Sequence, residues 1–167
     1  SAFKNAEEYA KRHVAFHFLA YGQLDQARHF VIEALEQKRQ KLGDYPYIAR
    51  NDKEIVMAAV AKDGLALKNA SDELKNDKEL LMVAMAQNYI ALQHASDELK
   101  KDKQFIMDAV AKNGWALRYA SDELKNNKEV VLTAVKNSRL ALKLASDELK
   151  RNDKDVLLLL ITKDALA

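Results

Sequence analysis

The sequence predicts an all-α solenoid, in which short helices stack as tandem units. The first observation is a repeat: the letters ASDELK occur at Ala70, Ala95, Ala120 and Ala145, always 25 residues apart. The second is composition, because the 167 residues include one proline and four glycines, and this scarcity favours helix. Hydrophobic residues make up 49% of the chain, enough for a core between stacked units.

The repeat divides most of the chain into four complete units and a shorter fifth. Counted from Asp52, the complete units are 52–76, 77–101, 102–126 and 127–151, and a truncated fifth covers 153–167. Self-similarity at a fixed period of this length is typical of solenoids, whose units bury their apolar faces on one another. We therefore predict an N-terminal helical cap over residues 1–45 and helical repeats over residues 46–167.

Each unit is expected to begin with a helix that is sandwiched between its neighbours. Asn51 and Glu54 have the N-cap and N3 spacing of a capping box, and the later units repeat it except the third, where Asp102 is an alternative cap. Apolar residues cover more than one narrow stripe of this helix, as expected for a buried helix. In the first unit they are Ile55, Val56, Met57, Ala59 and Val60.

The end of this first helix differs between units. Gly64 and Gly114 suit a left-handed position that terminates a helix. Tyr89 and Arg139 stand at the same offset, where a positive φ would cost more. We therefore expect the turns at Tyr89 and Arg139 to close differently or to carry strain.

A second helix is predicted in each unit, and the repeated motif follows it. Leu67 and Ala70 recur in all four complete units, with small alanines that let backbones approach closely. The spacing of Leu67, Ala70 and Leu74 allows one continuous helix, but serine followed by two acids is also a good N-cap. We favour a break at Ser71 and a short helical turn that ends at Lys75, with Leu74 buried in either case.

The first 43 residues do not follow the period. We predict helices over about Phe3–Tyr21 and Leu24–Leu42, each ending at a glycine, Gly22 or Gly43. The linker Asp44–Tyr47 follows, and its proline prevents the second helix from running on.

Part of this segment matches a known pattern. Gly22, Ala27, Phe30 and Ala34 take the places of a turn glycine, a small residue, an aromatic residue and a further alanine. The stretch Gly22–Leu35 resembles the second half of a tetratricopeptide repeat in these positions. We interpret it as a helical hairpin whose Ala27, Phe30 and Ala34 face caps the first repeat.

The repeats carry a longer motif. In the first unit its residues are Asp52, Lys53, Glu54, Val56, Ala59, Val60, Gly64, Ala66, Leu67, Ala70, Ser71 and Leu74. This pattern resembles a bacterial family catalogued as a domain of unknown function, whose members carry tandem copies of D-K/R-E-x-V-x-x-A-V-x-x-x-G-x-A-L-x-x-A-S-x-x-L. The resemblance implies a module of a larger bacterial protein, in some members a secreted effector, and it supplies no catalytic residues.

Charge and composition exclude several classes of function. The formal net charge is +2, from 27 basic and 25 acidic residues, which is too balanced for a strongly electrostatic nucleic-acid binder. Cysteine is absent, which rules out disulfides, thiolate metal sites and cysteine nucleophiles. The apolar run Val156–Ile161 is too short to span a membrane. No signal peptide is visible in these residues, and a targeting segment that has been removed is an open alternative. We expect either a bacterial cytoplasmic location or translocation into a host cell.

Candidate catalytic and metal-binding residues are weak. His13 and His17 lie one helical turn apart and His29 lies on the next predicted helix, a spacing that can hold a metal. Without a Glu-x-x-His pattern, we expect these rings to pack instead. Asp72 and Glu73 recur in every complete unit. Such recurrence is typical of acidic residues that stabilise helix N-termini, and it is rare for catalytic pairs. We therefore predict a non-enzyme without metal or cofactor.

Two adjacent offsets before the repeated motif vary between units. We name these positions the variable strip: Lys68, Asn69, Gln93, His94, Arg118, Tyr119, Lys143 and Leu144. Solenoids bind partners on extended surfaces, and Tyr and Arg are typical interface anchors, so we predict a scaffold for protein–protein interaction with Arg118 and Tyr119 as anchors. The alternatives are a structural spacer with a drifting solvated face, and a reader of single-stranded RNA. Trp115 is expected in the core.

The C-terminal segment predicts a second contact. Leu157, Leu158, Leu160 and Ile161 belong to the first helix of the truncated unit. Terminal solenoid units need a polar outer face, which this helix lacks. We therefore expect that the native chain continues or that this face pairs with another copy.

Overall fold

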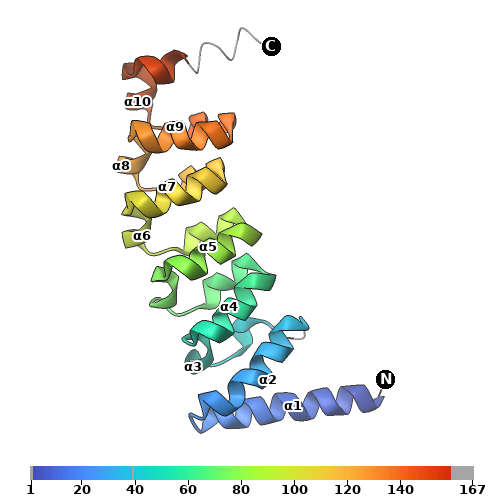
Figure 1. The fold of residues 1–167 in the computed structure, drawn as a ribbon. Helices are drawn as coiled ribbons and strands as arrows, with labels where there is room; N and C mark the ends of the chain where they lie inside the picture. The colour runs from blue at the N-terminus through green and yellow to red at the C-terminus, as the bar shows by residue number, and fades with distance from the viewer. Residues whose placement is uncertain (1, 39, 159–167) are drawn as a thin grey trace. The chain divides into compact units, whose positions relative to one another are not determined.

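The computed structural model describes residues 2–38 and 40–158, and every regular element in these ranges is helical (Figure 1). The predicted all-α repeat fold is confirmed. The chain forms two compact units, Ser1–His94 and Ala95–Ala167, which we call the N-terminal and C-terminal units. None of the helices in the described ranges is long and apolar enough to cross a bilayer.

The N-terminal unit contains a helical hairpin followed by the first repeats. Its helices α1 and α2 pack against each other, and α2 packs on α4. Its elements are α1 (Ala2–Ala20), α2 (Leu24–Glu36), η1 (Leu42–Asp44), α3 (Tyr47–Arg50), α4 (Lys53–Lys62), η2 (Gly64–Asn69), η3 (Leu74–Asn76), α5 (Lys78–Gln87) and η4 (Tyr89–His94).

The C-terminal unit repeats the same order of a short helix, a ten-residue α-helix and a six-residue 3₁₀-helix. Its elements are α6 (Asp97–Lys101), α7 (Lys103–Lys112), η5 (Gly114–Tyr119), α8 (Asp122–Lys125), α9 (Lys128–Asn137), η6 (Arg139–Leu144) and α10 (Asp147–Asn152). Residues 154–158 are again helical.

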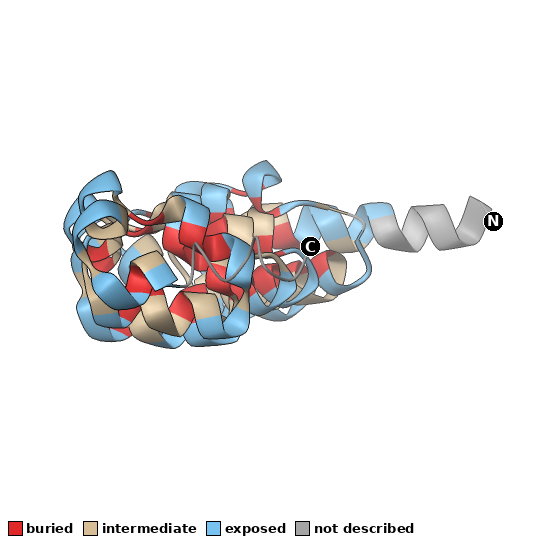
Figure 2. Ribbon diagram, turned by 90° about the horizontal axis from the view of Figure 1, so that it is seen from above, coloured by how far each residue is buried: buried red, intermediate tan, exposed pale blue. Residues whose placement is uncertain are grey.

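Within each unit the repeats form two layers. In the N-terminal unit α4 packs on α5 and η2 on η4, and in the C-terminal unit α7 packs on α9 and η5 on η6. Buried residues lie on the inward sides of these helices (Figure 2). A ten-residue α-helix is about 15 Å long, and six residues of 3₁₀-helix cover about 12 Å. The 3₁₀-helix therefore runs back along the α-helix for a similar length with fewer residues.

The first helix of each repeat begins at the first letter of the repeat. The Asp52 carboxylate accepts a hydrogen bond from the Ile55 amide at 2.9 Å, and the equivalent caps are Asp77, Asp102 and Asn127. The predicted N-cap at Asn51 is wrong by one residue, and the alternative cap proposed for the third unit is the general rule. Asp52 has the extended backbone of an N-cap, whereas Asn51 ends α3.

Gly64 and Gly114 do not adopt the predicted left-handed conformation. Gly22 is the one glycine with positive φ in the described ranges. A Cβ on Gly64 would instead overlap the carbonyl oxygen of Ala84, and one on Gly114 would overlap that of Ala134. These glycines therefore let the 3₁₀ layer touch the backbone of the next first helix.

The turn between the two helices has the same extended backbone in all four repeats, and a side-chain cap in the first three. Asp63 has extended backbone, and its carboxylate accepts from the Leu65 amide at 3.0 Å. Asn88 and Asn113 cap the next two 3₁₀-helices in the same way. Tyr89 and Arg139 have no positive φ, so the different closure or strain expected there is not found.

The repeated ASDELK motif joins consecutive repeats. The chain breaks at Ser71 as predicted, where the hydroxyl accepts from the Leu74 amide at 3.2 Å. The same hydroxyl donates to Asn51 Oδ1 at 2.5 Å, and the Ser71 amide donates to the Arg50 carbonyl at 2.9 Å. Leu74 is buried. One serine therefore closes the helical turn that it begins and holds the end of α3, which precedes the first repeat.

The N-terminal hairpin differs from its prediction in two respects. Helix α2 ends at Glu36 rather than Leu42, because Lys38 has φ of 54° and a left-handed residue ends a helix. The buried face of α2 consists of Ala27, Val31 and Leu35, and Phe30 is only half-buried. The face predicted from the tetratricopeptide-like pattern is therefore rotated.

The segment expected to be a linker contributes to the core. Tyr45 is buried and stacks on Phe16 of α1 with ring centroids 5.4 Å apart. Burial raises the pKa of Tyr45 to about 12. Pro46 precedes α3 as its N-cap residue, so it starts this short helix rather than stopping α2. The linker thus anchors the hairpin to the first repeat.

Candidate interaction surfaces

The variable strip lies at the ends of the 3₁₀-helices. Its first offset is exposed in every repeat, and its second offset is half-buried. Because η2 packs on η4 and η5 on η6, the structure brings four strip residues together in each unit. They are Lys68, Asn69, Gln93 and His94 in the N-terminal unit, and Arg118, Tyr119, Lys143 and Leu144 in the C-terminal unit.

Buried residues hold the strip in place. Leu67, Leu92, Leu117 and Leu142 each precede an exposed strip residue and are at most 4% exposed. The strip side chains therefore project from a backbone that is fixed by core packing. The repeat keeps the buried leucine constant and varies the neighbouring exposed residue, an arrangement suited to recognition.

Trp115 lies on the same side of η5 as Arg118, because side chains three residues apart eclipse in a 3₁₀-helix. It is half-buried rather than in the core as predicted. Leu140, at the same offset, is 48% exposed, so this offset lies at the edge of the core. Trp115 is the single tryptophan of the chain and is therefore a fluorescence reporter beside Arg118.

A groove in the N-terminal unit was not predicted from the sequence. Its volume is about 490 Å³, and it opens where α2, α4 and η2 end. Its polar lining includes Lys38, Gln40, Lys41, Lys62, Asp63, Lys68 and Asn69, and its apolar lining includes Leu35, Leu42, Ala59, Leu65 and Ala66. We call it the lysine groove. Two residues of the variable strip, Lys68 and Asn69, belong to it.

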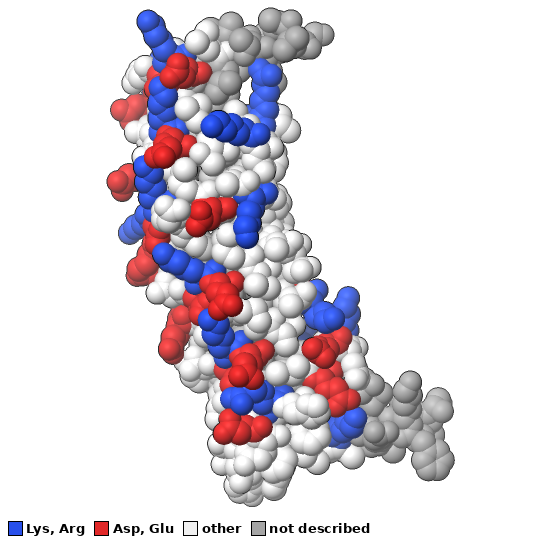
Figure 3. Space-filling model, in the orientation of Figure 1, with Lys and Arg blue, Asp and Glu red and all other residues white. Residues whose placement is uncertain are grey.

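Other charged residues form a ladder between repeats. In each unit basic and acidic side chains alternate along one edge (Figure 3). Lys53 Nζ lies 2.8 Å from both Asp77 Oδ2 and Glu79 Oε2 in the next repeat. In the C-terminal unit Lys103 pairs with Glu129 at 2.6 Å and Lys128 with Asp153 at 3.0 Å.

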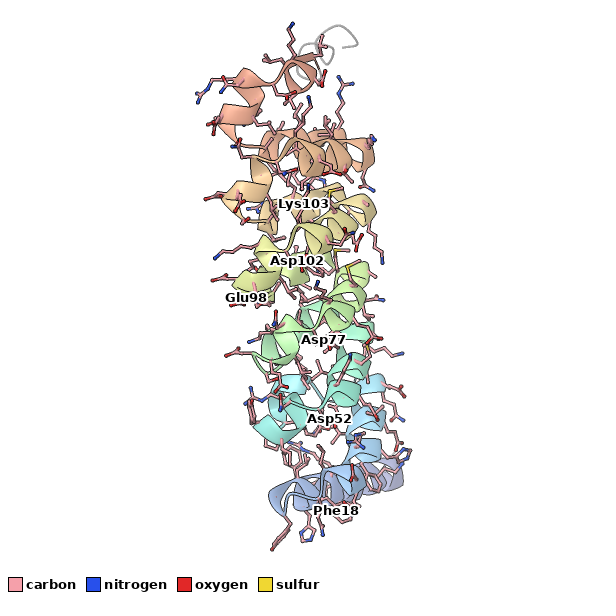
Figure 4. The ribbon with its side chains drawn as sticks, turned by 60° about the vertical axis from the view of Figure 1, so that its left-hand side comes forward. Phe18, Asp52, Asp77, Glu98, Asp102 and Lys103 are labelled. Carbon is pink, nitrogen blue, oxygen red and sulfur yellow. The ribbon has the colours of Figure 1, made fainter. Side chains whose placement is uncertain are left out.

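The ladder explains the letters DKE that begin the first two units. Asp52 and Asp77 stand at the starts of successive first helices (Figure 4), where each caps its own helix. Arg28 of α2 pairs with Asp52 at 2.8 Å, so the hairpin supplies the cation that a preceding repeat would supply. Burial is the largest single influence on Asp77 and opposes its ionisation. The hydrogen bond and charge of Lys53, together with the Leu80 and Glu79 amides, outweigh burial and lower the pKa of Asp77.

The acidic pairs of the repeated motif have the structural role that was expected. Asp72 and Glu73 are exposed, and Lys75 pairs with Asp72 at 3.1 Å. Glu98 lies in the first turn of α6 (Figure 4), where the N–H groups and the Ser96 hydroxyl lower its pKa. These carboxylates lie at helix starts, where negative charge is favourable.

The histidines of the hairpin contact aromatic rings. His13 packs edge-on against Tyr9 at 4.5 Å, and His17 lies 4.8 Å from Tyr21. His29 lies next to Phe30 with centroids 5.8 Å apart. In the described part of the chain, no three His, Cys, Asp or Glu side chains are grouped to hold a metal ion.

The predicted C-terminal face is only partly described. Leu157 is half-buried and Leu158 is 57% exposed. Leu160 and Ile161 lie outside the described residues. The expected self-association through this face stays a prediction.

Comparison with known families accounts for the repeats. The sequence profile of the domain of unknown function DUF4116 matches residues 52–100 and 102–150, more than half of the chain. The chain belongs to the DUF4116 family. No curated protein and no solved structure matches it.

Each DUF4116 match covers two of the 25-residue repeats. The two matches therefore align Gly64 with Gly114, and Tyr89 with Arg139. This pairing explains why glycine occurs at alternate repeats. In this chain each match therefore consists of one repeat that approaches the next backbone through glycine and one that carries a large side chain at this offset.

Proposed function

We propose that this chain is a non-catalytic scaffold for protein–protein interaction and a module of a larger bacterial protein. Secretion of that protein as an effector is the more specific form of the proposal. The observation that carries the proposal is the variable strip, which places exposed, differing side chains beside constant buried leucines. The DUF4116 repeats supply the frame. The C-terminal unit supplies the anchors, because Arg118 is exposed and Tyr119 half-buried at the end of η5.

The chemistry of the strip favours a protein partner over RNA. Residues 52–151 contain 17 basic and 16 acidic residues, so these repeats offer little net charge for phosphate neutralisation. Much of this charge is also engaged in the ladder of ion pairs. A mixed polar and aromatic strip is instead typical of protein interfaces.

The test compares partner capture by three forms of the whole chain. The first is the parent, the second carries Arg118→Glu and Tyr119→Ala, and the third carries Lys112→Glu as a matched charge control. Lys112 ends α7 in the same unit and is exposed outside the strip. Partners captured quantitatively by the parent and the control should be lost from the double variant, and circular dichroism should show the same helicity in all three.

Binding is then measured with a purified partner by the emission of Trp115. A partner that covers Arg118 should change this emission, because Trp115 lies three residues earlier in η5. If the double variant retains every partner of the parent, the strip is not the binding site and the proposal fails. Capture of RNA alone, with a steep salt dependence, would also contradict it.

A further inference from the structure

We propose that the lysine groove binds an acidic segment of a partner protein, with an apolar side chain of that segment on the groove floor. The proposal rests on the scaffold function and adds the chemistry of the partner. Lys38 follows α2, Lys62 ends α4 and Lys68 lies near the end of η2. Each helix end favours a basic residue locally, and the fold brings these ends together around one groove.

Charge is the first argument for an acidic partner. The groove has four lysines, Lys38, Lys41, Lys62 and Lys68, against one acid, Asp63. All four lysines are exposed. Among residues 2–38 and 40–158 none of their ammonium groups pairs with a carboxylate, whereas Lys53 on the same helix as Lys62 binds two. The groove therefore concentrates positive charge that the fold does not neutralise, and it attracts acidic groups.

The floor of the groove favours a peptide rather than a small anion or a nucleic acid. Leu35 and Leu42 are buried beneath it, and Leu65 is half-buried in its lining. The volume of about 490 Å³ is that of a ligand pocket. A peptide supplies an apolar side chain for this lining, which a small anion does not.

A second copy of this chain does not offer such a segment from its repeated motif. Asp72 and Glu73 are exposed, but the adjoining Leu74 is buried in the fold. The acidic pairs at Asp97 and Asp122 likewise precede buried leucines. In the fourth copy of the motif Leu149 is half-buried beside the exposed Asp147 and Glu148, so this copy also lacks a fully exposed apolar side chain. The proposed occupant is a segment of a partner protein.

The test uses fluorescence anisotropy with the whole chain and a defined probe. The probe is a fluorescein-labelled peptide of about a dozen residues that carries glutamates around two leucines. Three further probes are the same peptide with serines for leucines, the same peptide with lysines for glutamates, and an oligouridine of similar charge. The peptide with glutamates and leucines should bind saturably, and its binding should weaken as salt rises.

Paired charge reversals locate the site. Lys41→Glu with Lys62→Glu should weaken binding about tenfold, because two attractions become repulsions. Lys112→Glu with Lys136→Glu is the matched control, since both lysines are exposed and lie in the last turns of first helices in the C-terminal unit. The control should bind the peptide within about twofold of the parent.

Three results would overturn the proposal. They are absence of saturable binding to the parent, equal loss in the groove and control variants, and tighter binding of the oligouridine than of the acidic peptide. None of them decides the scaffold function, which is tested at Arg118 and Tyr119. If the Arg118 and Tyr119 variant loses its partners while the groove does not bind the acidic peptide, the strip is the interface and the groove is not.

Discussion

Gly64 lies so close to the carbonyl oxygen of Ala84 that a Cβ at this position would overlap it. The pair joins the 3₁₀-helix of the first repeat to the first helix of the second. Gly114 and Ala134 have the same relationship in the second DUF4116 match. The interface between successive repeats is therefore a backbone contact as well as a contact between side chains.

Replacing Gly64 by alanine should destabilise the chain by about 2 kcal/mol or more, because the contacted group is backbone and cannot rotate away. Urea unfolding followed by circular dichroism measures the change. Gly22→Ala is the control, since its φ of 70° carries strain but no atom lies within 4 Å of the added Cβ. It should cost about 1 kcal/mol. A smaller loss at Gly64 than at Gly22 would contradict the close approach.

Ser71→Ala should cost about 1–2 kcal/mol, because it removes an N-cap and leaves Asn51 without its hydroxyl donor. Ser138→Ala is a matched control in the C-terminal unit, because Ser138 precedes η6 without a side-chain cap hydrogen bond. The control should unfold within about 0.5 kcal/mol of the parent. Equal losses at the two serines would show that the repeated motif is not the joint between repeats.

Stability should fall in acid through the ladder of ion pairs. The pKa of Asp77 is lowered in the folded chain, so an unfolded chain takes up a proton at a higher pH, near 4. The stability that Asp77 contributes is therefore present above about pH 4 and is lost as pH falls through its folded pKa.

The Lys53→Met variant isolates this effect. It should be less stable than the parent at pH 7, and the difference should shrink as pH falls below about 4. Lys112→Met is the control, because no ion pair of Lys112 occurs in the described part of the chain. Thermal unfolding at a series of pH values measures both. A difference between Lys53→Met and the parent that persisted unchanged in strong acid would contradict the role of Asp77.

The repeat itself was enough to predict the fold class, the break at Ser71 and the burial of Leu74. Those features depend on local spacing within one unit. The position of the N-cap was missed by one residue because Asn51 and Asp52 are both good caps. Only the contact between Asn51 and Ser71, twenty residues apart, shows that the asparagine serves the joint instead.

Features that depend on contacts between repeats could not be derived from one unit. Gly64 is needed because it contacts a carbonyl in the next repeat, and this contact cannot be seen within one unit. From the sequence alone, a glycine after a helix suggested a left-handed turn. The role of Lys53 became clear only from its contacts with Asp77 and Glu79 at the start of the next repeat. The lysine groove collects residues from separate helix ends, and its one sequence signal is the basic cluster at residues 38–41.

Stability and recognition depend on different residues of each repeat, and one comparison in the C-terminal unit tests this most directly. Urea unfolding is measured for the parent, for Arg118→Ser and for Ser121→Ala, three residues away. Ser121 caps α8 through the Leu124 amide, so its loss should cost about 1 kcal/mol or more, whereas the exposed Arg118 should change stability by less than about 0.5 kcal/mol. A loss at Arg118 as large as that at Ser121 would contradict the account.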